Sequence, residues 1–377
     1  MKNSLLVIAV IAALGVAFAI WRQQDATYDW QLPGSLPLPV VPPDNPMSDV
    51  KIELGRWLFH DTRLSGNGTT SCASCHVQGL AFTDGRSRSV GATGELHPRS
   101  SMSLVNVAYT SRLTWANPLL DRLEDQALIP LLGDDPVEMG MGGREGEIEQ
   151  LLRSDPRYRE LVPQAFPQDE DPYSLLNGVR AISTFTRTII GAASPYDLYL
   201  AGDDKALSAS AERGMQLFFS ERLECFHCHG GFNFTDSTTH ANSSVAAVCF
   251  HNTGLYNIDG KGAYPADNTG LFDMTGDRRD MGRFKAPSLR NVAVTAPYMH
   301  DGSVATLAEV IAHYERGGRL IDDGPLAGDG RLSPFKSEFV SGFALSAEER
   351  ADLIAFLQSL TDPTVLTDER FANPFLD

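Results

Sequence analysis

Apolar residues recur at helical spacing in several separate stretches of the chain. One such set, spaced at i, i+3, i+4 and i+7, comprises Leu307, Val310, Ile311 and Tyr314. This spacing predicts a helix that points Tyr314 inward. His313 lies about one residue's rotation off the apolar face, so we expect it to point toward solvent. Gly317 and Gly318 follow and are expected to end the helix.

Two pairs of amphipathic segments repeat in the two halves of the chain. The short segments are 54–59 and 213–218, and the longer ones are 174–190 and 346–360. In the last segment Ser346 is placed to cap the helix, with Glu349 completing a capping box. Alternating patterns typical of strands are poor throughout. The sequence therefore predicts a mainly α fold.

The first apolar run is different in kind, because it extends unbroken from Ser4 to Trp21 after a single Lys. A short positive region followed by such a run is typical of an export signal. Residues 17–19, Ala-Phe-Ala, form a possible cleavage site, although the run is also long enough to remain as a membrane anchor. We expect a periplasmic protein and exclude residues 1–24 from the fold.

The charge of the chain narrows its possible partners. Among 377 residues the net charge is −17, and Lys and Arg form no basic run. Binding to nucleic acid needs clustered positive charge on the protein, so that class of function is excluded. The acidic balance weakly favours a basic docking partner.

Four of the five cysteines fall into two C-x-x-C-H motifs. These are Cys72-Ala73-Ser74-Cys75-His76 and Cys225-Phe226-His227-Cys228-His229. In this motif two thiols attach a c-type haem and the adjacent His ligates its iron. A thioredoxin-like redox pair or half of a zinc site would not explain the trailing His twice. The motifs therefore predict two covalent haems.

A helix before and after each motif predicts two cytochrome c-like domains in tandem. We place them at residues 25–198 and 199–377, with a linker over 194–208. Cys249 belongs to neither motif and is interpreted as a buried thiol. It forms a C-x-H pair with His251, but one pair gives too few ligands for a metal site.

With both motifs placed, residues 45–362 resemble the bacterial dihaem cytochrome c peroxidase and MauG superfamily. The matching stretches are LGRWLFHDTRLS (54–65), VEM (137–139), SPYDLYLAGDDKALS (194–208) and APSLRNVAVTAPYMHDGS (286–303). The stretch HNTGLYNIDGKGAYPADNTG (251–270) is similar to a narrower branch, the MbnH-like enzymes, which are encoded beside a copper-binding partner.

The resemblance assigns different roles to the two haems. The first haem, on His76, reacts with peroxide, and Ala92 stands where several peroxidases place a sixth ligand. His97 is offset from that position; we interpret it as a surface residue, with iron ligation as the alternative. The second haem, on His229, takes its other ligand fourteen residues after His300, where cytochrome-oxidising peroxidases have Met and MauG-like enzymes have Tyr. Here that residue is Tyr314.

Further site residues follow from the resemblance alone. Gln126, Pro130 and Glu138 match the distal pocket of the first haem, and Glu138 is the candidate acid and base for peroxide cleavage. Burial beside a haem would raise its pKa. Trp115 matches the tryptophan that carries electrons between the haems.

The resemblance also implies a calcium ion between the domains. Thr295 and Pro297 match two of its ligand positions. The third expected ligand is Asn, and Ser100 replaces it. The calcium site is therefore expected without its usual set of ligands.

The leading functional hypothesis is oxidation of a partner protein's residues, in particular tryptophan, by a high-valent dihaem state formed with hydrogen peroxide. A Tyr ligand supports it, because an anionic oxygen stabilises higher iron oxidation states whereas Met raises the potential. By analogy with the MbnH-like branch, the partner would be a small copper-binding protein. One alternative is peroxide reduction with electrons from a small cytochrome or cupredoxin. Another is a non-enzymatic electron carrier with both haems six-coordinate.

Overall fold

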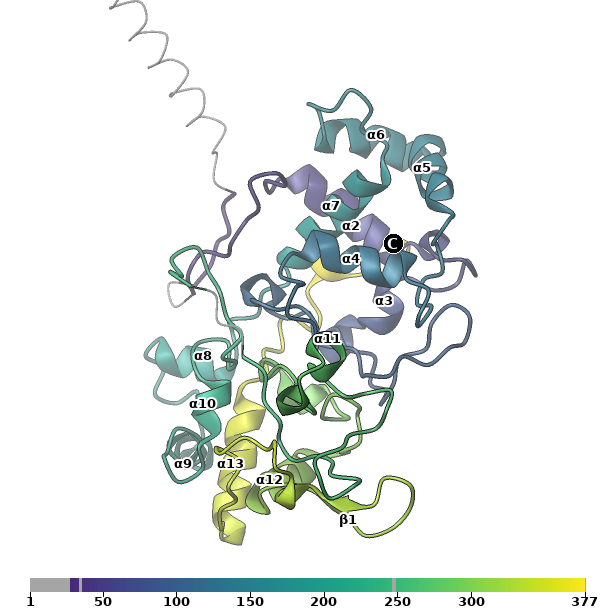
Figure 1. Ribbon diagram of the computed structural model, residues 1–377. Coiled ribbons are helices and arrows are strands. Elements are labelled where there is room, and N and C mark those ends of the chain that lie inside the picture. The colour runs from purple at the N-terminus through teal and green to yellow at the C-terminus, as the bar shows by residue number, and fades with distance from the viewer. Residues whose placement is uncertain (1–27, 34–35, 246–248, 377) are drawn as a thin grey trace, which may run out of the picture.

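The computed structural model describes residues 28–33, 36–245 and 249–376, and it confirms the mainly helical fold (Figure 1). The expected export segment, residues 1–24, lies outside this range. None of the helices within the range is long and apolar enough to cross a membrane. The helices of the first half are α2 (Asp49–His60), α3 (Cys72–Cys75), α4 (Leu123–Leu132), α5 (Glu145–Ser154), α6 (Pro156–Ala165) and α7 (Leu175–Arg187).

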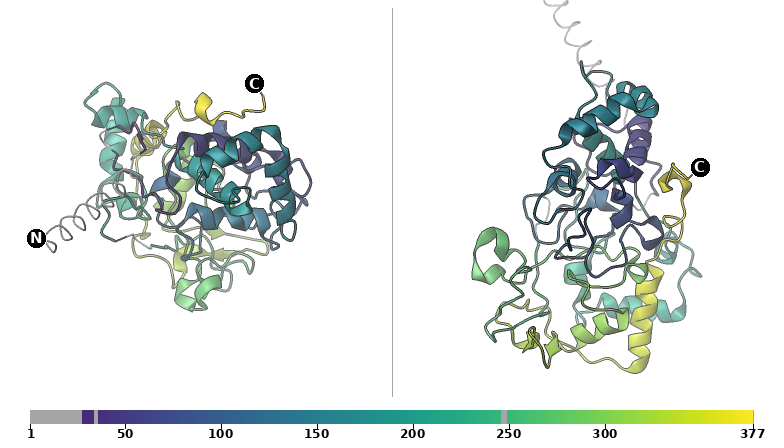
Figure 2. Two further views of the ribbon diagram at one scale, coloured as in Figure 1. Left: turned by 90° about the horizontal axis from the view of Figure 1, so that it is seen from above. Right: turned by 90° about the vertical axis from the view of Figure 1, so that its right-hand side faces the viewer.

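The second half contains the remaining helices and the two short strands. The helices are α8 (Pro195–Leu200), α9 (Ala209–Phe218), α10 (Cys225–His229), α11 (Phe272–Thr275), α12 (Leu307–Glu315) and α13 (Ala347–Ser359). The strands β1 (Leu320–Ile321) and β2 (Gly328–Asp329) pair antiparallel. The right-hand view of Figure 2 shows α12 and α13 at the opposite end of the molecule from α5 and α6.

The helices before and after each attachment loop pack together at a glycine. In the first half a Cβ on Gly55 of α2 would lie 2.0 Å from the carbonyl oxygen of Ala181 on α7. In the second half a Cβ on Gly214 of α9 would lie 1.9 Å from the carbonyl oxygen of Asp352 on α13. Each helix pair approaches so closely that only Gly fits at the crossing. The predicted repeat of two cytochrome c-like units is visible in this shared contact.

The four predicted helical segments all form helices in the structure. The segment 174–190 forms α7 with Ser174 as its cap, and 346–360 forms α13. Ser346 accepts from the backbone N–H of Glu349, whose side chain accepts from the Ser346 N–H, so the capping box is confirmed. The short segments lie within α2 and α9.

The end of the chain returns to the first half. After α13 the segment drawn in yellow runs back toward α2 and α4 (Figure 1), where Val365 and Phe371 join the core of the first half. The buried His60 ring, through Nε2, contacts the Phe371 carbonyl oxygen at 3.2 Å. The division at residue 198 stays a prediction, but the first core also uses residues from the end of the chain.

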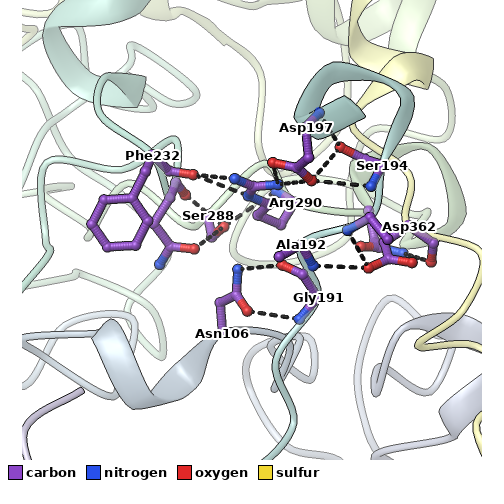
Figure 3. A network of polar contacts seen from close by, with 12 residues as sticks. Asn106, Gly191, Ala192, Ser194, Asp197, Phe232, Ser288, Arg290 and Asp362 are labelled. Atoms are coloured by element: carbon purple, nitrogen blue, oxygen red, sulfur yellow. Dashed lines mark hydrogen bonds and ion pairs between the residues drawn. The ribbon is translucent and has the colours of Figure 1, made fainter. Parts of the chain in front are cut away.

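A buried polar network joins the two halves around the linker (Figure 3). Arg290, whose side chain is 2% exposed, donates to both carboxylate oxygens of Asp197 at 2.7 and 2.6 Å. It also donates to the Phe232 carbonyl oxygen, just after the second attachment loop. Asp362 accepts from the backbone N–H groups of Ala192 and Ala193 at 2.8 and 2.9 Å. These contacts fix the linker against the second attachment loop.

Candidate active site

Both attachment loops hold their histidine in the same way. His76 Nδ1 lies 2.8 Å from the carbonyl oxygen of Phe82, and His229 Nδ1 lies 3.1 Å from that of Phe234. Phe82 and Phe234 have the rare left-handed backbone conformation, with φ of 60° and 50°. A carbonyl can only accept, so Nδ1 carries the proton and Nε2 keeps its lone pair for a metal. Both loops therefore fit a haem iron at Nε2.

A large cavity in the second half joins the second attachment loop to α12. Cys225, Cys228 and His229 line it on one side, and Tyr314 lines it from α12. Most of the remaining lining is apolar, including Leu223, Val292, Leu307, Ile311, Leu353 and Leu357. An apolar cavity that meets two thiols, an imidazole and a phenol fits a covalently attached haem.

Tyr314 has the environment expected of a ligand that lacks its metal. Among the described residues its hydroxyl has no hydrogen-bond partner, although a buried tyrosine hydroxyl normally finds one. Burial raises the pKa of Tyr314 well above its ordinary value, and the nearby thiols of Cys228 and Cys225 raise it further. Iron ligation would supply the missing partner and favour the phenolate. The inward orientation predicted from helical spacing agrees with this position.

The prediction for His313 was wrong. Its side chain is buried rather than turned to solvent, and Nε2 lies 3.0 Å from the Thr253 carbonyl oxygen. The irregular segment around Thr253 covers this face of α12, so the helix is buried on more than its apolar stripe. The helix ends as expected, because Gly317 N–H donates to Tyr314 and Gly318 N–H to His313.

The residues assigned to the first haem's distal side come together on α4 and the loop that follows it. Gln126 and Pro130 lie on α4, and the Met139 N–H donates to the Pro130 carbonyl oxygen at 2.8 Å, which fixes Glu138 beside the helix. Burial raises the pKa of Glu138 to about 7. Gln126 Oε1 is buried without a hydrogen-bond partner among the described residues. The Glu138 carboxyl and the Gln126 amide therefore suit a pocket in which a bound molecule exchanges a proton with the protein.

A turn over residues 89–97 closes against the Glu138 loop. The Ala92 N–H donates to the Glu138 carbonyl oxygen at 2.6 Å, and Gly91 approaches the Val137 carbonyl too closely for a side chain. Ala92 carries only a methyl group, so this turn offers no sixth ligand at that position. His97 Nε2 lies 3.8 Å from Glu138 Oε1. His97 is thus a neighbour of the acid–base candidate, a role that the sequence did not reveal.

Trp115 lies at the edge of the same cavity as the second attachment loop. Its Nε1–H donates to the Ser100 carbonyl oxygen at 3.0 Å. The ring of His300, buried and stacked on Phe284, meets Trp115 edge to face with centroids 6.5 Å apart. Trp115 therefore lies next to the second attachment loop's cavity, and its role in carrying electrons between the haems stays a prediction.

The expected calcium ligands are neighbours, but their oxygens have other partners. Ser100, Thr295 and Pro297 all line the cavity. The Ser100 hydroxyl donates to the Met299 carbonyl at 3.2 Å, and that of Thr295 donates to the Val292 carbonyl at 3.1 Å. Hydroxyl oxygens that donate to carbonyls can still accept, so the cluster is compatible with a cation. The calcium ion stays a prediction.

Cys249 is half-buried, so the prediction of a buried thiol was wrong. Asp236 lies beside it and contacts His251 Nε2 through Oδ2 at 2.5 Å. Asp236, His251 and Cys228 also lie close enough together to resemble a metal site. Cys228 is a haem-attachment residue, however, so the group is explained by the haem loop. The sequence could not reveal the Asp236 contact, which joins residues on separate loops.

Comparison with known proteins agrees with this geometry. The model of the di-haem cytochrome c peroxidase family matches residues 49–205, and a RoxA-like, cytochrome c-like model matches 283–319. The chain is 36% identical over 372 residues to cytochrome-c peroxidase IdrP1 of Pseudomonas sp. strain SCT, covering 93% of this chain and 91% of that relative. It is 32% identical over 338 residues to the methylamine utilization protein MauG of Methylorubrum extorquens, covering 89% and 84%.

Among solved structures, a MauG-like protein associated with microbial copper homeostasis superposes with a TM-score of 0.91. The two are 52% identical, and the match covers 93% of this chain and 100% of that one. Full-length relatives, the shared fold and two attachment loops lead to the same conclusion: this chain belongs to the dihaem cytochrome c peroxidase and MauG family.

Proposed function

We propose that this protein uses hydrogen peroxide to oxidise tryptophan on a small, exported copper-binding protein. The family assignment makes it a peroxidase-type oxidoreductase with two c-type haems. The observation that carries the finer proposal is Tyr314, which lines the cavity shared with Cys225 and Cys228 and whose hydroxyl has no hydrogen-bond partner among the described residues. An anionic oxygen ligand favours oxidised iron, whereas a thioether favours rapid electron entry from a cytochrome.

Methionines are present in the cavity, but they belong to other contacts. Met299 packs in the cluster around Trp115 and Phe284, and Met102 contacts His76 of the first attachment loop through its backbone. Tyr314, by contrast, lies on α12 near both attachment thiols. The position that distinguishes the two branches of the family therefore carries the ligand of the protein-oxidising branch.

The chain's own residues would accept and donate the proton that moves during peroxide cleavage. When bound, the haems supply the two-electron oxidation by peroxide. Glu138 is placed to take the proton from one peroxide oxygen and return it to the other, which leaves as water. With a tryptophan donor the net reaction consumes one peroxide, inserts one oxygen into the indole and releases one water. Trp115, which lines the second haem's cavity, would carry electrons between the haems.

The partner is proposed from the solved structure described above, a MauG-like protein associated with microbial copper homeostasis that is 52% identical to this chain. The proposal also includes export to the periplasm and a calcium ion at Thr295 and Pro297, with Ser100 in the place of the expected Asn ligand. Metal analysis of the purified protein, with and without chelator, tests the calcium ion directly: about one per chain is expected, and none after mild washing would contradict it.

The enzyme function is tested by giving the holoprotein a choice of donor. A small copper-binding protein that contains tryptophan is incubated with the holoprotein and stoichiometric peroxide, then analysed by mass spectrometry. We expect added oxygen on tryptophan, absent when either enzyme or peroxide is omitted and lost in Trp115→Phe. In a parallel reaction, reduced cytochrome c should be consumed slowly. Rapid cytochrome turnover without partner oxidation would favour the alternative suggested by the peroxidase relatives.

A further inference from the structure

Lys285 is a buried lysine in the second haem's cavity that none of the roles above uses. The residue is only 4% exposed, and it lines the cavity together with His229 and Tyr314. It is the one Lys or Arg among the cavity-lining residues that the structure describes. Its backbone N–H donates to the Trp115 carbonyl oxygen at 2.8 Å, which fixes it next to that tryptophan.

The Lys285 ammonium has no anionic partner within the described chain. The charge of Asp236 raises the pKa of Lys285. Asp236 contacts His251 at 2.5 Å, however, and makes no ion pair with the lysine. Glu224, the acid that lines the cavity, lies 2.6 Å from His227. Burial accordingly lowers the pKa of Lys285 to about 7.

Burying an ammonium group without a partner costs free energy, so a buried lysine is expected to contact an anion. The cavity offers one source of that anion. A haem attached at Cys225 and Cys228 brings propionate carboxylates into a space that is otherwise mostly apolar. Carboxylates buried there would in turn need a positive partner.

We propose that Lys285 forms an ion pair with a propionate carboxylate of the second haem and positions that haem beside Trp115. The lysine connects the two because its main chain contacts Trp115 and the buried residue lines the cavity. It acts through the haem and is a positioning residue. The inference rests on the attachment of the second haem and is independent of which substrate the enzyme oxidises.

The test measures the haem itself in the intact holoprotein. Lys285→Met should leave both haems attached, as checked by mass, and lower the midpoint potential of the second haem in a spectroelectrochemical titration. The potential falls because an uncompensated propionate charge stabilises ferric iron. The propionate bending band in the resonance Raman spectrum should also shift. Lys261→Met, which removes an exposed lysine from the same half, should change neither quantity.

Lys285→Arg covers the case in which the Met variant fails to incorporate haem. It keeps the charge but changes the geometry of the hydrogen bonds. We expect a potential near that of wild type together with a shifted propionate band. A Met variant with wild-type potential and propionate band would overturn the ion pair, as would an Arg variant whose propionate band is unchanged. Neither measurement requires the partner protein, so failure here is distinguishable from failure of the proposed substrate.

Discussion

Replacing Arg290 by Met should destabilise the junction between the two halves by about 3 kcal/mol. The Arg290 and Asp197 side chains are only 2% and 5% exposed, so removing the guanidinium leaves a buried carboxylate without its cation. Breaking such a pair from one side costs about 3–5 kcal/mol. The lower end applies because Ser194 still donates to Asp197 through its N–H and hydroxyl. The Phe232 carbonyl also loses the donors of Arg290.

The assay is urea unfolding of the holoprotein followed by far-ultraviolet circular dichroism. The matched control is Arg279→Met, which removes an arginine that also pairs with an aspartate but is 82% exposed. Exposed pairs contribute about 0–1 kcal/mol, so this variant should unfold near the wild-type midpoint. A shift in Arg290→Met no larger than that of the control would refute the claim that the buried pair fixes the junction.

Further predictions concern the site and the packing. Glu138→Gln should slow the reaction with peroxide about 10²- to 10⁴-fold in stopped-flow measurements, the usual effect of losing an acid–base group, while haem content is unchanged. Because burial raises the pKa of Glu138 to about 7, the wild-type rate should rise with pH through that value as the carboxylate form increases, and a flat profile would argue against its role as base. The same raised pKa means that the folded state binds more protons than the unfolded state between about pH 4.5 and 7, so this group's contribution to stability falls as pH rises across that window. Gly214→Ala should cost about 1–3 kcal/mol or more, because its Cβ would lie 1.9 Å from the Asp352 carbonyl oxygen, whereas Gly146→Ala in α5, with open space around it, should be neutral or slightly stabilising in the same unfolding assay.

Local patterns were sufficient to predict the elements that carry the haems. The C-x-x-C-H motifs fix the attachment residues by chemistry alone, and the capping residues fix where α13 begins. Helical spacing placed Tyr314 on the inward face of α12 correctly. It failed for the adjacent His313, because a helix pattern identifies one buried face and cannot show that a distant segment near Thr253 covers another.

Contacts between loops could not be predicted in the same way. The approach of His97 to Glu138 depends on how the 89–97 turn closes, which no periodicity records. The position of Lys285 is equally hidden, since a lysine in a sequence is expected at the surface. Only the cavity shows that its side chain is enclosed. The buried charges that matter most for the chemistry are thus the ones that the fold, and not the local sequence, reveals.

The most direct test of the account is the identity of the second haem's ligand, measured by electron paramagnetic resonance of ferric Tyr314→Phe holoprotein. The matched control is Tyr298→Phe, because Tyr298 lines the same cavity but donates its hydroxyl hydrogen to the Val292 carbonyl oxygen. We predict that Tyr314→Phe retains both haems, changes the low-spin signal of the second haem and no longer holds oxidising equivalents after peroxide is added, while the control matches wild type. A Tyr314→Phe spectrum identical to that of wild type would contradict the tyrosine ligand and, with it, the proposed oxidation of a partner protein.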